Sequence, residues 1–312
     1  MTETEQNKKD FRYFSEVLCL TKTRVMKDFE DWLHWYIDII HFDHVVVYDN
    51  ESIVDIKPLC EQYGDRVEYH TVIGHPDQYG IYMEHINNQS KSKWVIPLDD
   101  DEILYIGEKH DHDVNTFIRN MVASNQDKDV YKLAAVWANM LSYEPIALRS
   151  SSDKEFRTSL IDSHVYFSRL ACLRAQNIFA RRMEGWVKCF VRTDVEWSWY
   201  YNVYKGTVYN KGHNPTDENR GHAYALLPDG KQTSSSCHLG HKISKDCFVA
   251  HYSLKSREEW IAKCKRPCVS SISIRTLEGL LSFYDDVYKH RKCFESLTCV
   301  SEIFHAHNQS VK

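Results

Sequence analysis

The sequence has no apolar run of about eighteen residues, the length at which a membrane-spanning helix is predicted. It also has no stretch dense in Lys and Arg, which argues against a nucleic-acid partner. Its ten cysteines include no C-x-x-C pair, and its first residues lack the apolar core of a signal peptide. These absences predict reduced thiols and a soluble cytoplasmic protein of a bacterium or a virus-infected cell, unless an anchor has been removed from the chain.

Low-complexity sequence is also missing, since only seven prolines and eleven glycines occur in 312 residues and no repeat is visible. The apolar content of 43% is ample for a packed core. We expect a disordered tail over 1–14, one domain over 15–290 and a C-terminal tail over 291–312. Within the domain, a regular half spans about 15–110 and an irregular half spans about 111–290.

Strand and helix patterns alternate in the regular half. Apolar runs predict strands at 17–20, 44–50, 66–72 and 94–98, and helical spacing predicts helices at 25–41, 52–64 and 78–92. This alternation predicts an α/β fold in which helices flank a mostly parallel sheet. In the irregular half, strands are predicted at 130–141 and 186–193 and helices at 256–266 and 271–290.

The fourth predicted strand runs directly into a block of negative charge, "WVIPLDDDE" at 94–102. Adjacent carboxylates repel one another, so a positive charge is expected beside them, and a divalent metal ion is the first candidate. Two other predicted strands end in polar residues, in "LCLTKTR" and "VVVYDNES". Because parallel strands end at one edge, where ligands of such sheets bind, these segments are expected to form one site. The plain alternative for the acidic block is a solvated turn.

Four segments together resemble the nucleotide-sugar glycosyltransferases of the GT-A fold, and within them the family-2-like enzymes that share features with family 92. They are "CLTKTRVMKDFEDWLHWYI", "VVVYDNES", the D-x-D-E motif of "WVIPLDDDEIL" and "HYSLKSREEWIAKCKR" at 251–266. The resemblance covers residues 17–266. It implies that the regular half binds the nucleotide-sugar and that the irregular half supplies the acceptor site and a lid.

The resemblance also implies roles for particular residues. Asp99, Asp101 and His251 would be ligands of Mn²⁺ or Mg²⁺, with Glu102 as support. The expected donor-binding residues are Thr21, Lys22, Arg24, Asp49, Asp100 and Lys255. Asp100 is expected to point away from its two neighbours if the segment stays extended. Asp49 could instead be a turn residue, and His251 a core histidine.

An inverting transfer needs a carboxylate that acts as general base toward the acceptor hydroxyl. Glu184, before the strand at 186–193, is the first candidate, with Glu144, Asp153 and Glu155 behind it. The predicted function is therefore metal-dependent transfer of a sugar, from a UDP-sugar by preference, to a hydroxyl of a glycan or glycoconjugate. The alternatives are an inactive glycan-binding module of the same fold and a nucleotidyltransferase. The lack of glycine in "LTKTRVMKD" argues against the nucleotidyltransferase.

Overall fold

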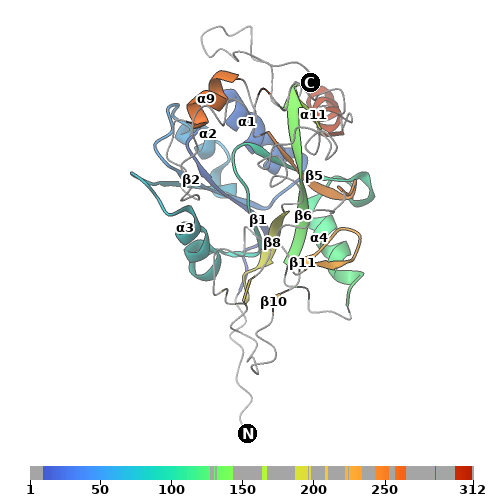
Figure 1. Cartoon of the computed structure of the whole chain (residues 1–312). Helices are drawn as coiled ribbons and strands as arrows, with labels where there is room; N and C mark the ends of the chain where they lie inside the picture. Colours follow the sequence, from blue (N-terminus) through green and yellow to red (C-terminus); the bar gives the residue numbers. More distant parts are fainter. Residues whose placement is uncertain are drawn as a thin grey trace.

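The structure is a computed structural model of the whole chain (Figure 1). It describes residues 10–126, 130, 132–142, 164–166, 187–195, 197, 208–209, 222–223, 225–233, 243–252, 257–264, 285 and 299–310. Its centre is an 11-stranded sheet whose main path has the order β12-β11-β6-β8-β4-β1-β2-β3. Strands β5, β7 and β13 are attached beside this path.

The first four strands along the chain form the parallel part of the sheet. They are β1 (Tyr13–Thr21), β2 (His44–Asp49), β3 (Val67–Thr71) and β4 (Ser92–Pro97). β1 lies between β2 and β4, and β2 pairs with β3, all in parallel. The predicted α/β fold with a mostly parallel sheet flanked by helices is confirmed. All four strands were predicted from their apolar runs, with ends displaced by a few residues.

The two faces of this parallel part pack against different helices. Alternate residues of β1 point to opposite sides, so Val17 and Cys19 join one core cluster and Leu18 joins the other. The first face is covered by α1 (Met26–His34), the π-helical turn η1 (Trp35–Ile39), α2 (Lys57–Glu61) and α4 (Val114–Ala123). The second is covered by α3 (Gln78–Glu84) and η3 (His85–Gln89). Asp77 and Asp113 cap α3 and α4, because their carboxylates accept hydrogen bonds from free amides of the first turn.

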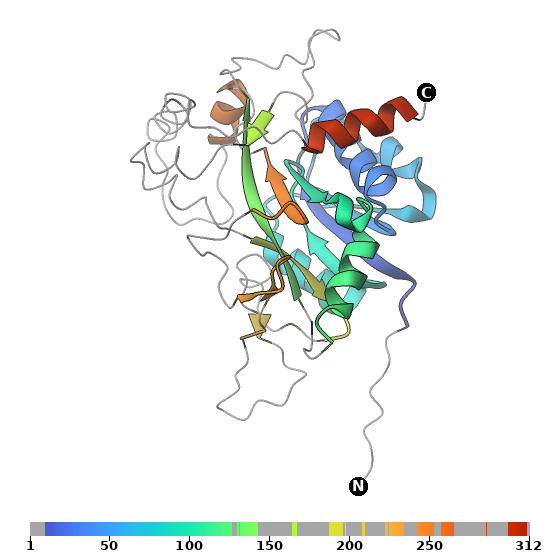
Figure 2. The same cartoon turned by 90° about the vertical axis from the view of Figure 1, so that its right-hand side faces the viewer.

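Strands from the later part of the chain extend the sheet beside β4. β8 (Val187–Arg192) lies antiparallel between β4 and β6 (Lys132–Ser142), as the apolar runs at 186–193 and 130–141 predicted. β13 (Cys247–His251) runs parallel to β6 and antiparallel to β5 (Glu102–Ile106). β6 and β13 therefore have the same direction as β1. Figure 2 shows β13 in orange beside the long green β6.

The remaining described elements are short. The strands are β7 (His164–Tyr166), β9 (Val208–Tyr209), β10 (His222–Ala223), β11 (Ala225–Leu226) and β12 (Gln232–Thr233). The helices are the 3-10 turns η2 (Gly64–Arg66) and η4 (Glu108–His110), and α9 (Arg257–Cys264). α9 lies within the helix predicted at 256–266. The helix predicted at 271–290 lies almost entirely outside the described residues.

The range predicted as a C-terminal tail, 291–312, contains helix α11 (Cys299–Ser310). α11 packs on η1 and α1, where Val300 is buried and Nε2 of His34 lies 3.2 Å from Oδ1 of Asn308 (Figure 2). The described part of this range is therefore an ordered helix docked on the domain.

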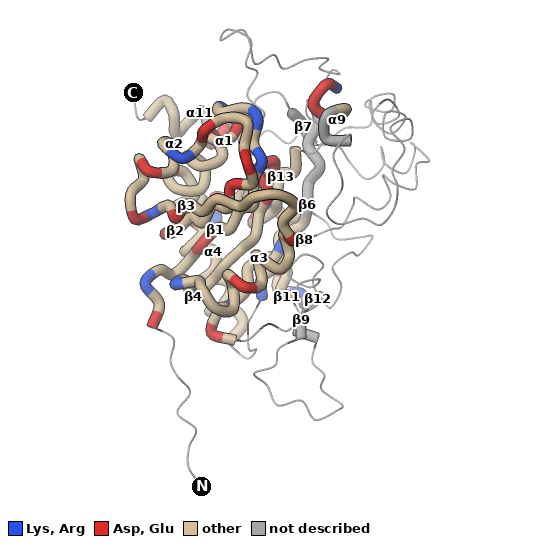
Figure 3. The backbone as a smooth tube through the Cα atoms, turned by 90° about the vertical axis from the view of Figure 1, so that its left-hand side faces the viewer, with Lys and Arg blue, Asp and Glu red and all other residues tan. Residues whose placement is uncertain are grey.

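Hydropathy and the distribution of charged residues can be read along the described elements. None of the described helices is long and apolar enough to cross a bilayer. On the side seen in Figure 3, blue and red segments are interspersed along the described tube, and no continuous blue stretch follows an element.

Candidate functional site

The carboxyl ends of the parallel strands bring several of the predicted polar residues to one edge of the sheet. Thr21 ends β1 and is paired in register with Asp49, which ends β2. The acidic run begins just after β4, and His251 ends β13. Since β13 and β1 run in the same direction, His251 lies at the same edge as Thr21. The sequence-based expectation of a single polar edge therefore agrees with the arrangement of these strands.

The acidic run folds as a tight turn and does not stay extended. The amide of Glu102 donates to the carbonyl of Asp99 at 3.1 Å, and the amide of Asp99 donates back to Oε2 of Glu102 at 2.9 Å. Trp32 on α1 donates its indole N–H to the same carbonyl at 3.1 Å. Gln78 on α3 donates to Oδ1 of Asp99 at 3.0 Å. These contacts fix the direction of the Asp99 carboxylate.

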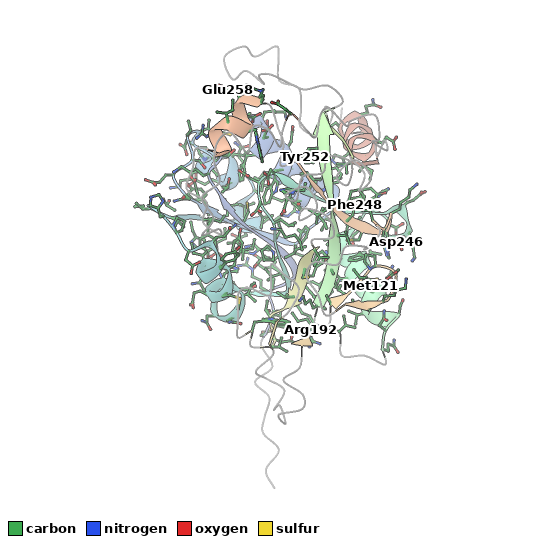
Figure 4. All side chains as sticks on the ribbon, in the orientation of Figure 1. Met121, Arg192, Asp246, Phe248, Tyr252 and Glu258 are labelled. Carbon is green, nitrogen blue, oxygen red and sulfur yellow. The ribbon has the colours of Figure 1, made fainter. Side chains whose placement is uncertain are left out.

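The positive charge beside this turn comes from a buried lysine far away in the sequence. Lys188 lies at the start of β8 and its side chain is 1% exposed. Its Nζ is 3.3 Å from Oδ2 of Asp99 and 3.0 Å from Oε2 of Glu102. The antiparallel register of β4 and β8 carries this end of β8 to the carboxyl edge, whereas Arg192, at its other end, is labelled toward the bottom of Figure 4.

Burial and charge have opposing effects on this cluster. Burial raises the pKa of Glu102 from 4.5 to about 8, although Lys188 acts in the other direction. Burial alone would lower the pKa of Lys188, but Asp99 and Glu102 outweigh it and raise this pKa above the ordinary value. Lys188 is therefore an ammonium ion that compensates the repulsion between the neighbouring carboxylates. Oε1 of Glu102 is buried and has no hydrogen-bond partner among the described residues.

Asp101 and His251 face each other beside this turn. Oδ1 of Asp101 lies 3.6 Å from Nε2 of His251, and the Tyr252 amide donates to the Asp101 carbonyl at 2.7 Å. Two ligands that each lie about 2.1 Å from one ion are separated by no more than about 4.2 Å, so this pair fits a shared Mg²⁺ or Mn²⁺. Figure 4 labels Tyr252, the next residue after His251, toward the upper end of the sheet.

The third predicted ligand, Asp99, is not gathered with this pair. Both of its carboxylate oxygens are engaged, one with Gln78 and the other with Lys188. Within the described part of the chain, no group of three or more His, Cys, Asp and Glu side chains is placed to hold a metal ion. A ligand role for Asp99 stays a prediction, and it would require this carboxylate to exchange Gln78 or Lys188 for the ion.

The other predicted donor-binding residues are divided between buried and exposed positions. Thr21 is buried, and its hydroxyl donates to Oδ2 of Asp100 at 2.6 Å. The Asp100 carboxylate therefore reaches the end of β1. Lys22 and Arg24 are exposed on the following loop, where Lys22 lies 3.9 Å from a carboxylate oxygen of Glu51. This group brings hydroxyl, carboxylate and basic side chains to the end of β1.

Asp49 is 7% exposed and organises the turn after β2. One carboxylate oxygen accepts from the amide of Ser52 at 2.9 Å, and the other accepts from the hydroxyl of Tyr69 at 2.7 Å. Glu51 in this turn has a positive φ of 55°, a conformation that costs free energy for a residue with a side chain. The structural turn role considered for Asp49 is therefore present, and a role in binding the nucleoside stays a prediction.

Glu184 and Lys255 lie outside the described residues, and so do the further candidates for the general base, Glu144, Asp153 and Glu155. Lys188 was missed, although a lysine inside the apolar run "WVKCFVR" was a usable signal. A lysine in a buried strand nearly always has a charged partner. The sequence could not name Asp99 and Glu102 as those partners, because the contact depends on where β8 enters the sheet.

No family model matches the sequence, and no curated protein matches it. Solved structures give distant similarities. TarS from S. aureus is 12% identical with a TM-score of 0.30, over 58% of this chain and 28% of TarS. Glucosyl-3-phosphoglycerate synthase from Mycobacterium tuberculosis, solved with Mn²⁺, uridine diphosphate and glucosyl-3-phosphoglycerate, is 12% identical with a TM-score of 0.28, over 40% of this chain and 44% of the synthase.

A third similarity is to 4-diphosphocytidyl-2C-methyl-D-erythritolsynthase from Anaerococcus prevotii. It is 12% identical with a TM-score of 0.25, over 49% of this chain and 67% of the synthase. This chain spans less than half the length of the first two proteins. TM-scores this low carry no argument, so the function has to be argued from the site itself.

Proposed function

We propose that the protein is a metal-dependent glycosyltransferase of the GT-A fold. It transfers a sugar from a nucleotide-sugar, by preference a UDP-sugar, to a hydroxyl of a glycan or glycoconjugate, with inversion. The proposal rests on one observation above all, the facing pair Asp101 and His251 at the carboxyl edge of a parallel sheet. Ligands of open α/β sheets bind beyond that edge.

In this proposal Asp101 and His251 hold the divalent ion, and the donor diphosphate supplies further oxygen ligands. Mg²⁺ commonly binds through one or two carboxylates together with substrate phosphates, so a site without three protein ligands is suited to a nucleotide-bound metal. When bound, the ion acts as a Lewis acid that stabilises the charge on the departing diphosphate. The two hydrogen bonds between Asp99 and Glu102 close the turn that carries Asp101, which faces His251.

The nucleotide would lie along the ends of β1 and β2. Asp49 is assigned to the nucleoside, and Thr21 with Asp100 to the ribose or the phosphates. Lys22 and Arg24 are exposed and can approach the diphosphate. Lys255 is proposed to add positive charge from the segment after β13.

For the acceptor, Glu184 is proposed as the general base that removes the hydroxyl proton. The residue precedes β8 by a few positions, and Lys188 places the start of β8 at the site. Glu184→Gln is therefore expected to slow transfer strongly while it leaves nucleotide binding unchanged.

The test is a thermal-shift screen of UDP, GDP, CMP and dTDP, each with and without Mn²⁺. We expect one diphosphate to raise the melting temperature only with Mn²⁺, and Asp101→Ala to abolish the shift, because saturating ligand stabilises only the folded state. The matched control is Asp65→Ala, since Asp65 is an exposed aspartate paired with Arg12 on the surface.

A second step separates the rival functions. The nucleotide identified in the screen is supplied as its sugar conjugates, and Mn²⁺-dependent release of the diphosphate is followed. Release of pyrophosphate from a nucleoside triphosphate would instead favour a nucleotidyltransferase. If no nucleotide shifts the melting temperature under any condition, the inactive glycan-binding module takes the place of the enzyme.

A further inference from the structure

The acidic run already contains its own counter-ion. Nζ of Lys188 contacts one oxygen of Asp99 and one of Glu102, and both Lys188 and Glu102 are almost completely shielded from water. Charges taken out of water are tolerated only where partners compensate them. Positive charge was expected beside the four carboxylates of the run, and Lys188 supplies part of it.

In Asp99 the carboxylate, the amide and the carbonyl all form hydrogen bonds with other parts of the protein. Its carboxylate accepts from Gln78 and Lys188, its amide donates to Glu102, and its carbonyl accepts from Trp32. These partners come from α1, α3, β5 and β8. The residue therefore ties four elements to the end of β4, which is a structural task.

Asp100 and Asp101 point elsewhere. Asp100 accepts from Thr21 at the end of β1, and Asp101 faces His251 at the end of β13. The turn between Asp99 and Glu102 separates the two sets of carboxylates.

We propose that Lys188 is a positioning residue that divides the acidic run into two parts with different tasks. Lys188 holds Asp99 and Glu102 in an internal ion-pair cluster, and Asp101 with His251 is the pair that binds the divalent cation. This inference rests on the proposed function, and it explains why binding of the cation should depend on a bound diphosphate.

The physical consequence concerns the number of ligands. Two protein ligands hold Mn²⁺ weakly, and oxygens from a diphosphate complete the coordination. Without the ammonium group, Asp99 would be an uncompensated carboxylate close to Asp101, with the oxygens of Glu102 beside it. Such a cluster of hard oxygen ligands binds a divalent cation without help from a nucleotide. Lys188 therefore makes occupation by the metal conditional on the donor.

The decisive experiment is a titration with Mn²⁺ alone, followed by the electron paramagnetic resonance signal of the free ion. Lys188→Met is expected to bind Mn²⁺ about tenfold more tightly than the wild type in the absence of any nucleotide, because the substitution removes a positive charge close to the cation site. The matched control is Lys132→Met, because Lys132 is a second fully buried lysine, on the adjacent strand β6. This control is expected to bind Mn²⁺ as weakly as the wild type does. A purely structural role for Lys188 predicts no gain in affinity, so a folded Lys188→Met protein without the gain overturns the proposal.

A second comparison decides the matter if Lys188→Met does not fold. Mn²⁺ is titrated into the protein with saturating UDP, for Asp99→Asn and for Asp101→Asn. Asp99→Asn is expected to stay within about threefold of the wild type, whereas Asp101→Asn loses about tenfold or more. Equal losses in both variants overturn the division of the run. The first titration needs no nucleotide, so it can succeed or fail independently of the proposed glycosyltransferase activity.

Discussion

At the scale of single residues, Lys188 is the group on which the candidate site depends most. It is a fully buried ammonium ion between two carboxylates that lie 89 and 86 positions before it in the sequence. A buried ion pair gains little over an apolar replacement of the whole group, but removal of one partner leaves the other charge buried and uncompensated. Lys188 is thus more important for the stability of the folded protein than the number of its contacts suggests.

Lys188→Met is therefore expected to lower the free energy of unfolding by about 3–5 kcal/mol, the range for a broken buried pair. Lys188→Arg keeps the charge and should lose less. Urea unfolding monitored by tryptophan fluorescence measures both values. A loss below about 1 kcal/mol for Lys188→Met would show that the ion pair is not formed in solution.

At the scale of elements, a second buried carboxylate joins the amino ends of the strands, far along β1 from the candidate site. Glu16 on β1 accepts hydrogen bonds from His44 on β2 at 2.8 Å and from His85 on η3 at 2.7 Å. It also accepts from Ser90 and Ser92 at the start of β4. Burial would raise the pKa of Glu16, but the hydrogen bonds from the two histidines outweigh it, and the pKa falls from 4.5 to about 2.

A carboxylate whose pKa is lowered by folding stabilises the folded protein fully at pH values above its unfolded-state pKa. This stabilisation is lost as the pH falls from the unfolded-state pKa through the folded-state pKa. For Glu16 the window runs from about pH 4.5 down to about pH 2. The stability difference between the wild type and Glu16→Gln is thus expected to be constant above pH 5 and to shrink by about 3 kcal/mol across that window. Urea unfolding at a series of pH values measures it. A difference that stays constant down to pH 3 would mean that folding does not lower the pKa of Glu16.

The elements also show what the sequence was able to predict. β1 to β4 were found because each is an apolar run between helices, and β6 and β8 because their runs are equally clear. β5 and β13 were not found. β5 begins inside the acidic run without any turn signal, and β13 pairs with residues more than 100 positions away. β5 is revealed by its pairing with β13, and β13 by its pairing with both β5 and β6.

At the scale of the whole molecule, the candidate site is assembled from both parts of the chain. Thr21, Asp49 and the acidic run come from the first hundred or so residues, whereas Lys188 and His251 come from β8 and β13. The edge of the sheet could be predicted from strand direction alone. The pairing of Asp99 with Lys188, and of Asp101 with His251, depends on strand order and could not be predicted.

The central claim is that Asp101 and His251 bind one divalent ion together with a nucleoside diphosphate. The most direct measurement is a double-mutant cycle by calorimetry, in which UDP is titrated with and without Mn²⁺ into the wild type, Asp101→Asn, His251→Gln and the double variant. Each single variant is expected to lose about 10- to 100-fold in Mn²⁺-dependent affinity. The double variant should lose little more Mn²⁺-dependent affinity than the single variant with the larger loss, because both residues bind the same ion. Losses that add as independent terms, or single variants that bind UDP and Mn²⁺ as the wild type does, would contradict the claim.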